Sequence, residues 1–209
     1  MSIVIAVDGT AASGKGTLAK KLAEHFGFAH LDSGSLYRLV ALGVTEAKGD
    51  PNKEEDALAA ARAIDPSKAN DPRIRTAEIG HAASLVSVFP AVRAALLNYQ
   101  RDFASRPPGA VVDGRDIGTV VCPRAQAKLF IDAAPEIRAH RRWLELGGSE
   151  AAILKELLER DARDRSRATA PLKPAPDAAL LDTTALDIDA AFKAALDLVE
   201  KALKVQPQG

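Results

Sequence analysis

The sequence predicts an α/β fold in which two layers of helices enclose a parallel sheet of five strands. Short apolar runs alternate with long Ala/Leu-rich segments, which is the order of elements in a parallel sheet covered by helices. A glycine-rich stretch at residues 9–17 separates the first apolar run from the first helical segment. The chain has 209 residues, 47% of them hydrophobic and 27% charged, so it can bury one ordinary globular core. We therefore expect a single domain with embedded subdomains.

Five short apolar runs are the expected strands, and an aspartate follows each of them. Ligands of open α/β sheets bind beyond the carboxyl ends of the strands, so these aspartates mark the edge where a site is expected. Some of them can instead cap the helix that follows. The runs cover residues 3–7, 29–31, 110–112, 128–131 and 179–181, and the aspartates are Asp8, Asp32, Asp113, Asp132 and Asp182.

Eight further segments have the composition of helices. Several carry start signals: Pro90 and Pro135 suit a first helical turn, and Ser149 precedes Glu150. The expected helices cover residues 17–26, 35–48, 54–63, 75–88, 90–104, 135–146, 149–167 and 187–204.

Two segments interrupt the alternation of strands and helices. The first, from about residue 38 to residue 103, is mostly helical with a polar break at DPSKANDPR. The second, at about residues 147–176, begins with two glycines and ends in the proline-rich sequence APLKPAP. Excursions of this kind build acceptor sites and closing lids, and ordinary helical decorations are the alternative.

Charge and cysteine content limit the possible partners. The 28 Lys and Arg residues equal the 28 Asp and Glu residues, so no basic excess favours nucleic acid or an anionic membrane. The single Cys122 excludes an internal disulfide, and the four histidines show no metal-ligand spacing. No signal-like N-terminal region occurs, and no window approaches the roughly 20 apolar residues of a membrane span. We expect a soluble, cytoplasmic protein without nucleic-acid or membrane partners.

The sequence GTAASGKGT at residues 9–17 predicts a phosphate-binding loop. Its glycines let backbone N–H groups and a helix N-terminus converge on one anion, and Lys15 adds a mobile positive charge. A glycine-rich surface turn with a solvated lysine is the alternative. Because Gly16 follows Lys15, the hydroxyl that would hold Mg²⁺ is delayed to Thr17 or replaced by water-mediated contacts. The GKGT ending resembles the loop of nucleoside monophosphate kinases.

The segment ERDARDRSR concentrates arginines near the end of an expected helix. On a helix, Arg160, Asp164 and Arg167 fall on one stripe, with Arg163 beside it. A solvated, salt-bridged helix face often explains such a run. Phosphoryl transfer, however, needs charge neutralisation in a closed site, and guanidinium groups suit that task.

The sequence DGRDIG, at residues 113–118, follows the third expected strand. Arg115 offers a bidentate phosphate clamp, and Asp116 can accept a hydrogen bond from an amino or hydroxyl group. Asp113 lies where a carboxylate could orient Mg²⁺ through water. The alternative is a plain strand-to-helix turn with an ion pair.

The sequence LDSGSLYR follows the second expected strand. Ser33 could bond phosphate oxygens and Arg38 could neutralise them. The segment can equally be a capped helix start with Tyr37 packed inside, and the two interpretations are compatible.

Together these motifs resemble those of the bacterial cytidylate kinases, which phosphorylate CMP and dCMP with ATP. The resemblance covers nearly the whole chain, and VDGRDIGTVV and the arginine-rich ending are more specific than the phosphate loop. The motifs that match in order and approximate spacing are DGTAASGKGT, LDSGSLYR, FPAVRAALLNYQ, VVDGRDIGTVVCP, AHRRWL and RDARDRSRATAPL.

The resemblance implies a P-loop kinase fold with a core at about residues 1–37, 104–146 and 177–204. It also implies an acceptor-binding subdomain at about residues 38–103 and a lid at about residues 147–176. The implied activity is ATP-dependent phosphorylation of CMP and dCMP in pyrimidine nucleotide metabolism, with Mg²⁺ bound to the ATP, by a monomer.

The resemblance further assigns roles to single residues. Mg²⁺ would contact Thr17 directly or Asp113 through water, and Arg141 or Arg142 would lie near the donor nucleotide. The implied catalytic residues are Lys15, Arg115, Arg160 and Arg163. The implied ATP-binding residues are Gly9, Thr10, Ala11, Ala12, Ser13, Gly14, Lys15, Gly16 and Thr17. The implied CMP-binding residues are Ser33, Tyr37, Arg38, Ser84, Arg93, Arg115, Asp116, Arg160, Asp164 and Arg167.

The chain departs from the family pattern in two places. Thr10 stands where relatives commonly carry proline or another residue, and Ala11 stands where some carry serine, so one phosphate contact could be missing. Residues 65–75 replace a larger insert with extra strands that many bacterial members carry. We therefore expect a compact, mainly helical acceptor subdomain.

Three other functions can be compared with CMP phosphorylation by the sequence features that each requires. The nearest is a related kinase for another small acceptor, such as UMP, AMP or shikimate, although Asp116 and Arg93 favour a base with amino and carbonyl groups. A nucleotide-dependent switch protein would carry a switch threonine and an NKxD motif, and neither is present. A nucleic-acid-binding module is opposed by the zero net charge.

Overall fold

The computed structural model describes residues 2–205, which form two compact units. The first unit contains the described residues up to Leu31 and from Phe103 onward, and the second contains Asp32–Asp102. Each unit has its own hydrophobic core. The first holds a β-sheet with its covering helices, and the second is built from helices.

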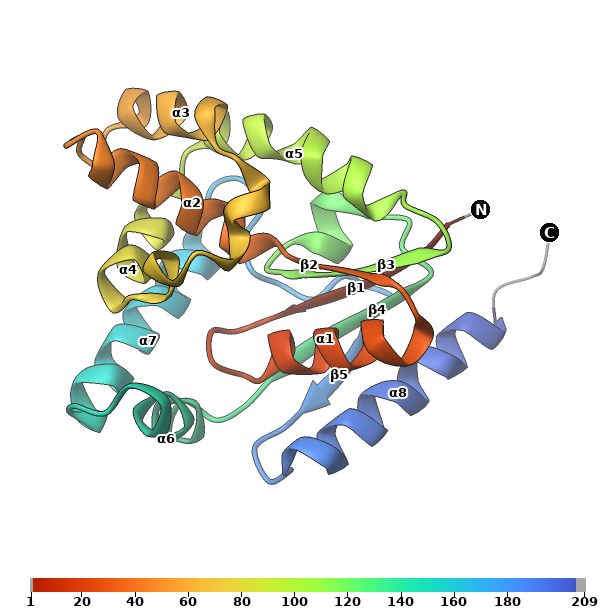
Figure 1. Cartoon of the computed structure of the whole chain (residues 1–209). Coiled ribbons are helices and arrows are strands. Elements are labelled where there is room, and N and C mark those ends of the chain that lie inside the picture. Colours follow the sequence, from red (N-terminus) through yellow and green to blue (C-terminus); the bar gives the residue numbers. More distant parts are fainter. Residues whose placement is uncertain (1, 206–209) are drawn as a thin grey trace. The chain divides into compact units, whose positions relative to one another are not determined.

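A five-stranded parallel sheet with the order β2-β3-β1-β4-β5 forms the centre of the first unit (Figure 1). The central strand β1 pairs with β3 and β4, so Asp8 lies opposite Gly114 on one side and Phe130 on the other. All five predicted strands are confirmed, and each reaches its aspartate or the residue after it. The strands are β1 (Ile3–Gly9), β2 (Ala29–Asp32), β3 (Gly109–Gly114), β4 (Ala127–Asp132) and β5 (Ala179–Asp182).

Helices α1 (Lys15–Phe26) and α8 (Ile188–Val205) pack side by side on one face of this sheet (Figure 1). Alternate strand residues such as Ile5 and Val7 meet the apolar residues of these helices in the core. The intervening Ala6 is fully buried as well, as expected for a central parallel strand covered on both faces.

The other helices of the first unit carry the conspicuous arginines. Helices α6 (Pro135–Leu146) and α7 (Glu150–Ser166) follow β4 and pack against each other, and a five-residue π-helix, Ile117–Val121, follows β3. Helix α7 ends one residue earlier than predicted, because Arg167 is a C-cap with φ −57° and ψ 133°. Arg167 therefore lies just outside the helix, and the prediction that it is helical is wrong, although it pairs with Asp164 as the predicted stripe requires.

The second unit contains no strand among residues 33–102, all of which the structure describes. The polar break forms two short 3-10 helices, because Asp65 and Asp71 each accept a backbone N–H two residues later. The fourth predicted helix begins two residues late, where the Thr76 hydroxyl caps it. The elements are α2 (Ser33–Glu46), α3 (Glu54–Ala63), the 3-10 helices Pro66–Asn70 and Pro72–Arg75, α4 (Ala77–Val86) and α5 (Pro90–Ala104).

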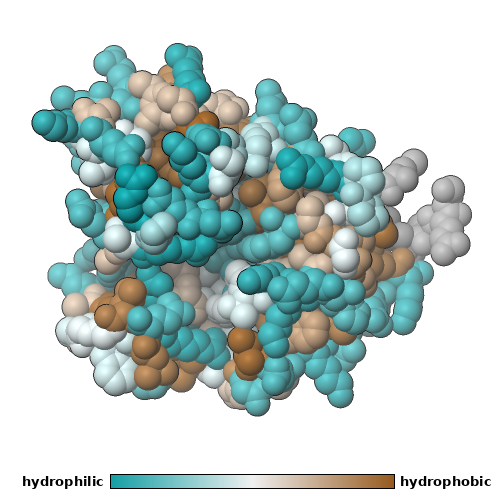
Figure 2. Space-filling model, viewed as in Figure 1, coloured by the Kyte–Doolittle hydropathy of each residue, from teal (hydrophilic) through white to brown (hydrophobic). Residues whose placement is uncertain are grey.

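Across residues 2–205, no single helix is long and apolar enough to cross a membrane. Helices α4 and α5 reach that length and hydropathy only as a pair, and the pair is bent by 102°. Their apolar side chains, including Ile79, Val86 and Leu96, lie in the core of the second unit. Figure 2 shows hydrophilic residues over most of the visible face, with hydrophobic residues in small separate patches.

Candidate active site

The predicted phosphate-binding loop lies between β1 and α1, at the carboxyl end of the central strand. Within it, Gly9, Ala12 and Gly14 have φ values of +154°, +59° and +86°, so the backbone changes direction at three points. Helix α1 begins at Lys15, and the N–H groups of its first turn, which have no partner within the helix, favour an anion. The loop backbone and the helix terminus can thus direct N–H groups toward one phosphate.

Side chains from neighbouring strands hold this loop. The Thr10 hydroxyl donates to Asp132 Oδ1 at 2.6 Å, so the residue that departs from the family pattern ties the loop to the end of β4. The Thr183 hydroxyl, in the segment after β5, donates to the Ser13 carbonyl at 3.1 Å. Lys15 Nζ donates to the Thr10 carbonyl at 3.3 Å, which places the lysine charge over the loop.

We expect Gly9→Ala to lower the free energy of unfolding by about 2 to 4 kcal/mol. A Cβ at Gly9 would lie 2.0 Å from the Ile131 carbonyl oxygen, and backbone of a central strand cannot yield cheaply. Gly27→Ala is the matched control, because Gly27 also has positive φ (+66°) but has no atom within 4 Å of its added Cβ. That variant should lose about 1 kcal/mol. Equal losses in urea unfolding would contradict the steric argument.

Asp8, the last residue before the loop, organises the neighbouring DGRDIG segment. Its two carboxylate oxygens accept the backbone N–H groups of Ile117 and Gly118 at 2.8 and 2.7 Å. Burial raises the pKa of Asp8 to about 6, although the two N–H donors and Arg115 act in the opposite direction. Asp8 therefore sets the turn that follows Arg115 and Asp116.

Asp8→Asn should change how stability depends on pH. Because the folded-state pKa of about 6 exceeds the ordinary 3.8, the folded protein binds this proton more tightly, and the wild type loses stability as pH rises through that window. The unfolding free energy of the variant relative to wild type should therefore increase by about 2 to 3 kcal/mol from pH 4 to pH 7. Urea unfolding at several pH values measures this difference. A constant difference would contradict the raised pKa.

Asp164 of α7 is the centre of the arginine cluster. It is 1% exposed, and its Oδ2 accepts Arg115 Nε at 2.9 Å, while its Oδ1 accepts Arg167. Burial raises the pKa of Asp164, but Arg115, Arg167 and Arg160 outweigh burial and hold that pKa below its usual range. One carboxylate is thus surrounded by three guanidinium groups, so these four side chains together carry a net positive charge.

This cluster brings together residues that the sequence predicted from two separate motifs. Arg115, at the end of β3, also donates to the Gly114 carbonyl at 3.2 Å. Asp116 is buried, and its carbonyl accepts the N–H of Val120 at 2.8 Å within the π-helix. Arg163 lies on α7 one residue before Asp164 and is partly exposed.

The two residues proposed for Mg²⁺ occupy different environments. Asp113 is buried, with Oδ2 2.9 Å from His30 Nε2, and its Oδ1 faces the loop, 3.8 Å from the position of a Cβ on Gly16. Thr17 is exposed in the first turn of α1. Within residues 2–205 no three His, Cys, Asp or Glu side chains group as metal ligands. One carboxylate and one hydroxyl fit Mg²⁺, which usually binds through substrate phosphates, waters and one or two carboxylates.

The second unit places the remaining predicted residues in its helices. Ser33 begins α2 and is buried, as is Tyr37, and Asp32 caps the helix by accepting the Ser35 N–H at 3.2 Å. The alternative of a capped helix start with Tyr37 packed inside therefore holds in the structure. The Arg93 guanidinium lies 5.5 Å from the centre of the Tyr37 ring.

Arg38 and Ser84 are tightly surrounded within the same unit. Arg38 Nη1 donates to the Ile74 carbonyl at 2.8 Å and lies 3.1 Å from the position of a Cβ on Gly80. Ser84 is 3% exposed, so it is not the surface helix residue that its position alone would suggest. A side chain on Gly80 would therefore displace the Arg38 guanidinium.

Some contacts near the loop were not predicted from the sequence, and the choice between Arg141 and Arg142 was left open. The Arg141 guanidinium donates to the Thr183 hydroxyl and carbonyl at 3.1 and 2.7 Å, whereas Arg142 pairs with Glu145 on the surface. His30 and Arg138 were not predicted as site residues. Asp8 was predicted only as one of the five aspartates at strand ends, and its bonds to Ile117 and Gly118 were not foreseen.

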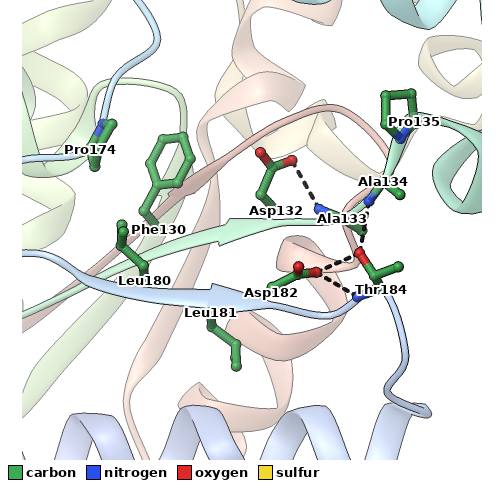
Figure 3. A pocket seen from close by; sticks show the side chains of 10 residues that line it. All are labelled: Phe130, Asp132, Ala133, Ala134, Pro135, Pro174, Leu180, Leu181, Asp182 and Thr184. Carbon is green, nitrogen blue, oxygen red and sulfur yellow. Dashed lines mark hydrogen bonds between the residues drawn. The ribbon is translucent and has the colours of Figure 1, made fainter.

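A pocket of about 460 Å³ opens where β4 and β5 end (Figure 3). Thr184 joins its two sides: its N–H donates to Asp182 Oδ1 at 2.8 Å, and its hydroxyl accepts the Ala134 N–H at 2.9 Å. The lining includes two of the strand-end aspartates, Asp132 and Asp182, but none of the residues predicted to be catalytic or to bind ATP, CMP or Mg²⁺. It consists of Phe130, Asp132, Ala133, Ala134, Pro135, Pro174, Leu180, Leu181, Asp182 and Thr184.

A phosphate-binding loop on the central strand, with guanidinium groups gathered at the same edge, defines a kinase of the P-loop class. The family model described as Cytidylate kinase matches residues 5–201, and the chain belongs to this family.

Relatives of known name agree with this membership. The chain is 54% identical over 203 residues to a cytidylate kinase of Rhodopseudomonas palustris (strain TIE-1), covering 95% of this chain and 96% of the relative. It is 54% identical over 205 residues to a cytidylate kinase of Afipia carboxidovorans, covering 96% and 98%. Among solved structures, a gluconokinase from Sinorhizobium meliloti 1021 aligns with a TM-score of 0.51 and 16% identity, covering 97% of this chain and 94% of that chain. At that identity the likeness concerns the fold alone.

Proposed function

We propose that this protein transfers the γ-phosphate of ATP to CMP and dCMP, giving CDP or dCDP and ADP. Family membership and the names of the 54% identical relatives support this reaction. The observation that carries the proposal is that the buried Asp164 binds both Arg115 and Arg167. These arginines lie at the edge of the sheet where β1 ends and the phosphate loop begins. The cluster supplies the positive charge that phosphoryl transfer requires.

The chemistry is an in-line attack by a CMP phosphate oxygen on the γ-phosphorus. The attacking oxygen is already an anion near neutral pH, so no general base is needed, and catalysis comes from alignment and charge stabilisation. In this proposal Lys15 bridges the donor and transferred phosphates. Arg115, Arg160 and Arg163 neutralise the charge that spreads over the transferred group.

The donor would bind at residues 9–17, with backbone N–H groups and Lys15 around its phosphates. Mg²⁺ bound to ATP would neutralise charge on the phosphates. Thr17 is the proposed direct ligand, and Asp113, whose Oδ1 faces the loop at Gly16, is the proposed contact through water. The 2.9 Å contact from His30 would hold Asp113 in that orientation. Arg141, joined to Thr183, is a better candidate than Arg142 for a contact with the donor nucleotide.

The proposed acceptor contacts follow the family motifs. In the first unit they include Arg115 for the acceptor phosphate and Asp116 for the cytosine amino group. Family membership supports the assignment of Ser84 and Asp116, which are both buried. The full proposed set is Ser33, Tyr37, Arg38, Ser84, Arg93, Arg115, Asp116, Arg160, Asp164 and Arg167.

We also propose that residues 38–103 bind the acceptor and that residues 147–176 act as a lid. Gly147 and Gly148, which start the lid segment, have φ values of +70° and +84° with open space around each, as suits a hinge. Closure of the lid would exclude water as a competing nucleophile.

We further propose that the protein is a cytoplasmic monomer. Its equal numbers of basic and acidic residues, 28 each, favour neither nucleic acid nor a membrane as a partner.

Product analysis tests the proposed reaction. The purified protein, incubated with CMP, ATP and Mg²⁺, should form CDP and ADP in equal amounts, as measured by chromatography. Without CMP, or with Mg²⁺ chelated, ADP formation should fall at least about 100-fold, because water is excluded and phosphate charge is no longer neutralised. ADP release at a similar rate with and without CMP would contradict both the proposed reaction and the proposed lid.

A further inference from the structure

A buried arginine that no predicted role includes connects the phosphate loop to helix α7. Arg138 of α6 is 1% exposed and is the largest of the fully buried side chains among residues 2–205. Its guanidinium donates to the Ala133 carbonyl at 2.8 Å, to the Ala11 carbonyl in the loop at 3.1 Å, and to Asp161 Oδ2 on α7 at 2.7 Å. One side chain therefore contacts three separate segments of the first unit.

The ion pair between Arg138 and Asp161 contributes little net stability to the fold. Both side chains are 2% exposed, and removing two charges from water offsets much of their attraction. Asp161 Oδ1 is buried and has no hydrogen-bond partner among the described residues. Apolar side chains of similar volume often stabilise such a position equally well. The directional bonds of the guanidinium are what an apolar pair could not reproduce.

Both anchored segments contain proposed catalytic groups. The Ala11 carbonyl directly precedes Ala12, a non-glycine residue with φ +59°. The bond from Arg138 therefore holds the loop next to a residue whose backbone conformation is unfavourable. Asp161 lies next to Arg160 and three residues before Asp164 on α7. Ala11 also packs with Ala139 and Leu157 in a small buried cluster beside the pair.

We propose that Arg138, paired with Asp161, is a positioning residue for phosphoryl transfer. It fixes the position of the phosphate loop relative to the arginine-bearing end of α7. The distance between the donor phosphates and Arg160 is thereby kept constant. The inference rests on the proposed function. A displacement of about 1 Å between reacting groups can cost about 100-fold in rate, so loss of this connection should reduce kcat even in a stable protein.

The test separates positioning from stability. Arg138→Met and Asp161→Leu should each lower the unfolding temperature, because each removes the buried partner of the remaining charge, and Asp161 then keeps only the exposed Arg165 at 3.9 Å. The double variant should recover most of the loss. With ATP and CMP saturating, kcat of the double variant should stay about 10-fold or more below wild type. A double variant with recovered unfolding temperature and wild-type kcat would overturn the proposal.

The control exchanges an exposed ion pair of the same unit. Lys21 on α1 and Asp189 on α8 pair at 2.9 Å with 36% and 84% exposed side chains. Lys21→Met/Asp189→Leu makes the same charge change and should keep kcat within about twofold.

Two further measurements keep the proposal testable. If the double variant does not fold, Arg138→Lys tests the proposal instead. The lysine ammonium retains the charge but cannot bond three divergent acceptors, so kcat should fall. A wild-type kcat would overturn the proposal. Calorimetric binding of MgATP separates this inference from the proposed function. A wild-type protein that binds MgATP but forms no CDP contradicts the proposed function only. In that case the affinity of the double variant decides, with several-fold weaker MgATP binding expected and equal binding overturning the inference.

Discussion

Lys15→Ala is expected to lower kcat for CMP phosphorylation by about 100-fold or more in a protein that remains folded. Lys15 is the first residue of α1, and its Nζ contacts the Thr10 carbonyl at 3.3 Å, so its charge lies over the phosphate loop. Charge moves between the donor and transferred phosphates during the reaction, and a preorganised cation there stabilises the transition state. A coupled assay of ADP release at saturating ATP and CMP measures the effect.

The matched control for this variant is Lys20→Ala on the same helix. Lys20 is exposed, and its removal changes the net charge equally, so kcat should remain within about twofold of wild type. Thermal unfolding of both variants checks that the fold is intact. If Lys15→Ala and Lys20→Ala had the same kcat, Lys15 would have no catalytic role.

Arg115→Ala should also lower kcat by about 100-fold or more, and it should reduce stability as well. The Arg115 side chain is 14% exposed, and its Nε bonds the buried Asp164 at 2.9 Å. Its removal takes one positive charge from the cluster and leaves Asp164 with one cation fewer. Breaking a buried pair from one side costs about 3 kcal/mol or more, so urea unfolding must accompany the kinetics.

Two companion variants separate the kinetic effect from the stability effect. Arg115→Lys keeps the charge near Asp164 but cannot bond both Asp164 and the Gly114 carbonyl, so we expect stability closer to wild type with kcat still reduced about 10-fold or more. Arg124→Ala removes an exposed arginine of the same unit and should leave both quantities unchanged. A folded Arg115→Ala protein with wild-type kcat would contradict the assigned role.

The sequence predicts most of the fold because local signals and the parallel topology agree. Each apolar run that ends in an aspartate forms a strand, and the glycine loop with Lys15 lies where the strand-loop-helix order requires. Helix ends were less predictable. The chain leaves α7 at Ser166, and Arg167 then reaches Asp164 from an extended backbone, which helical spacing does not describe.

The contacts that hold the site depend on tertiary structure and could not be predicted from spacing. Asp8 bonds the Ile117 and Gly118 N–H groups only because β1 and β3 are neighbours in the sheet. Arg138 belongs to a charged helical run that looks solvent-exposed in sequence, yet the packing of α6 against the loop and α7 buries it completely. In the same way, the partner of Thr10 becomes apparent only when β4 pairs with β1.

Competition among acceptors tests the central claim most directly. CMP, dCMP, UMP, AMP and shikimate would be present together at equal concentrations with limiting MgATP, and the products would be separated and quantified. The proposed function predicts that CDP and dCDP account for most of the transferred phosphate. Predominant phosphorylation of UMP, AMP or shikimate would contradict it.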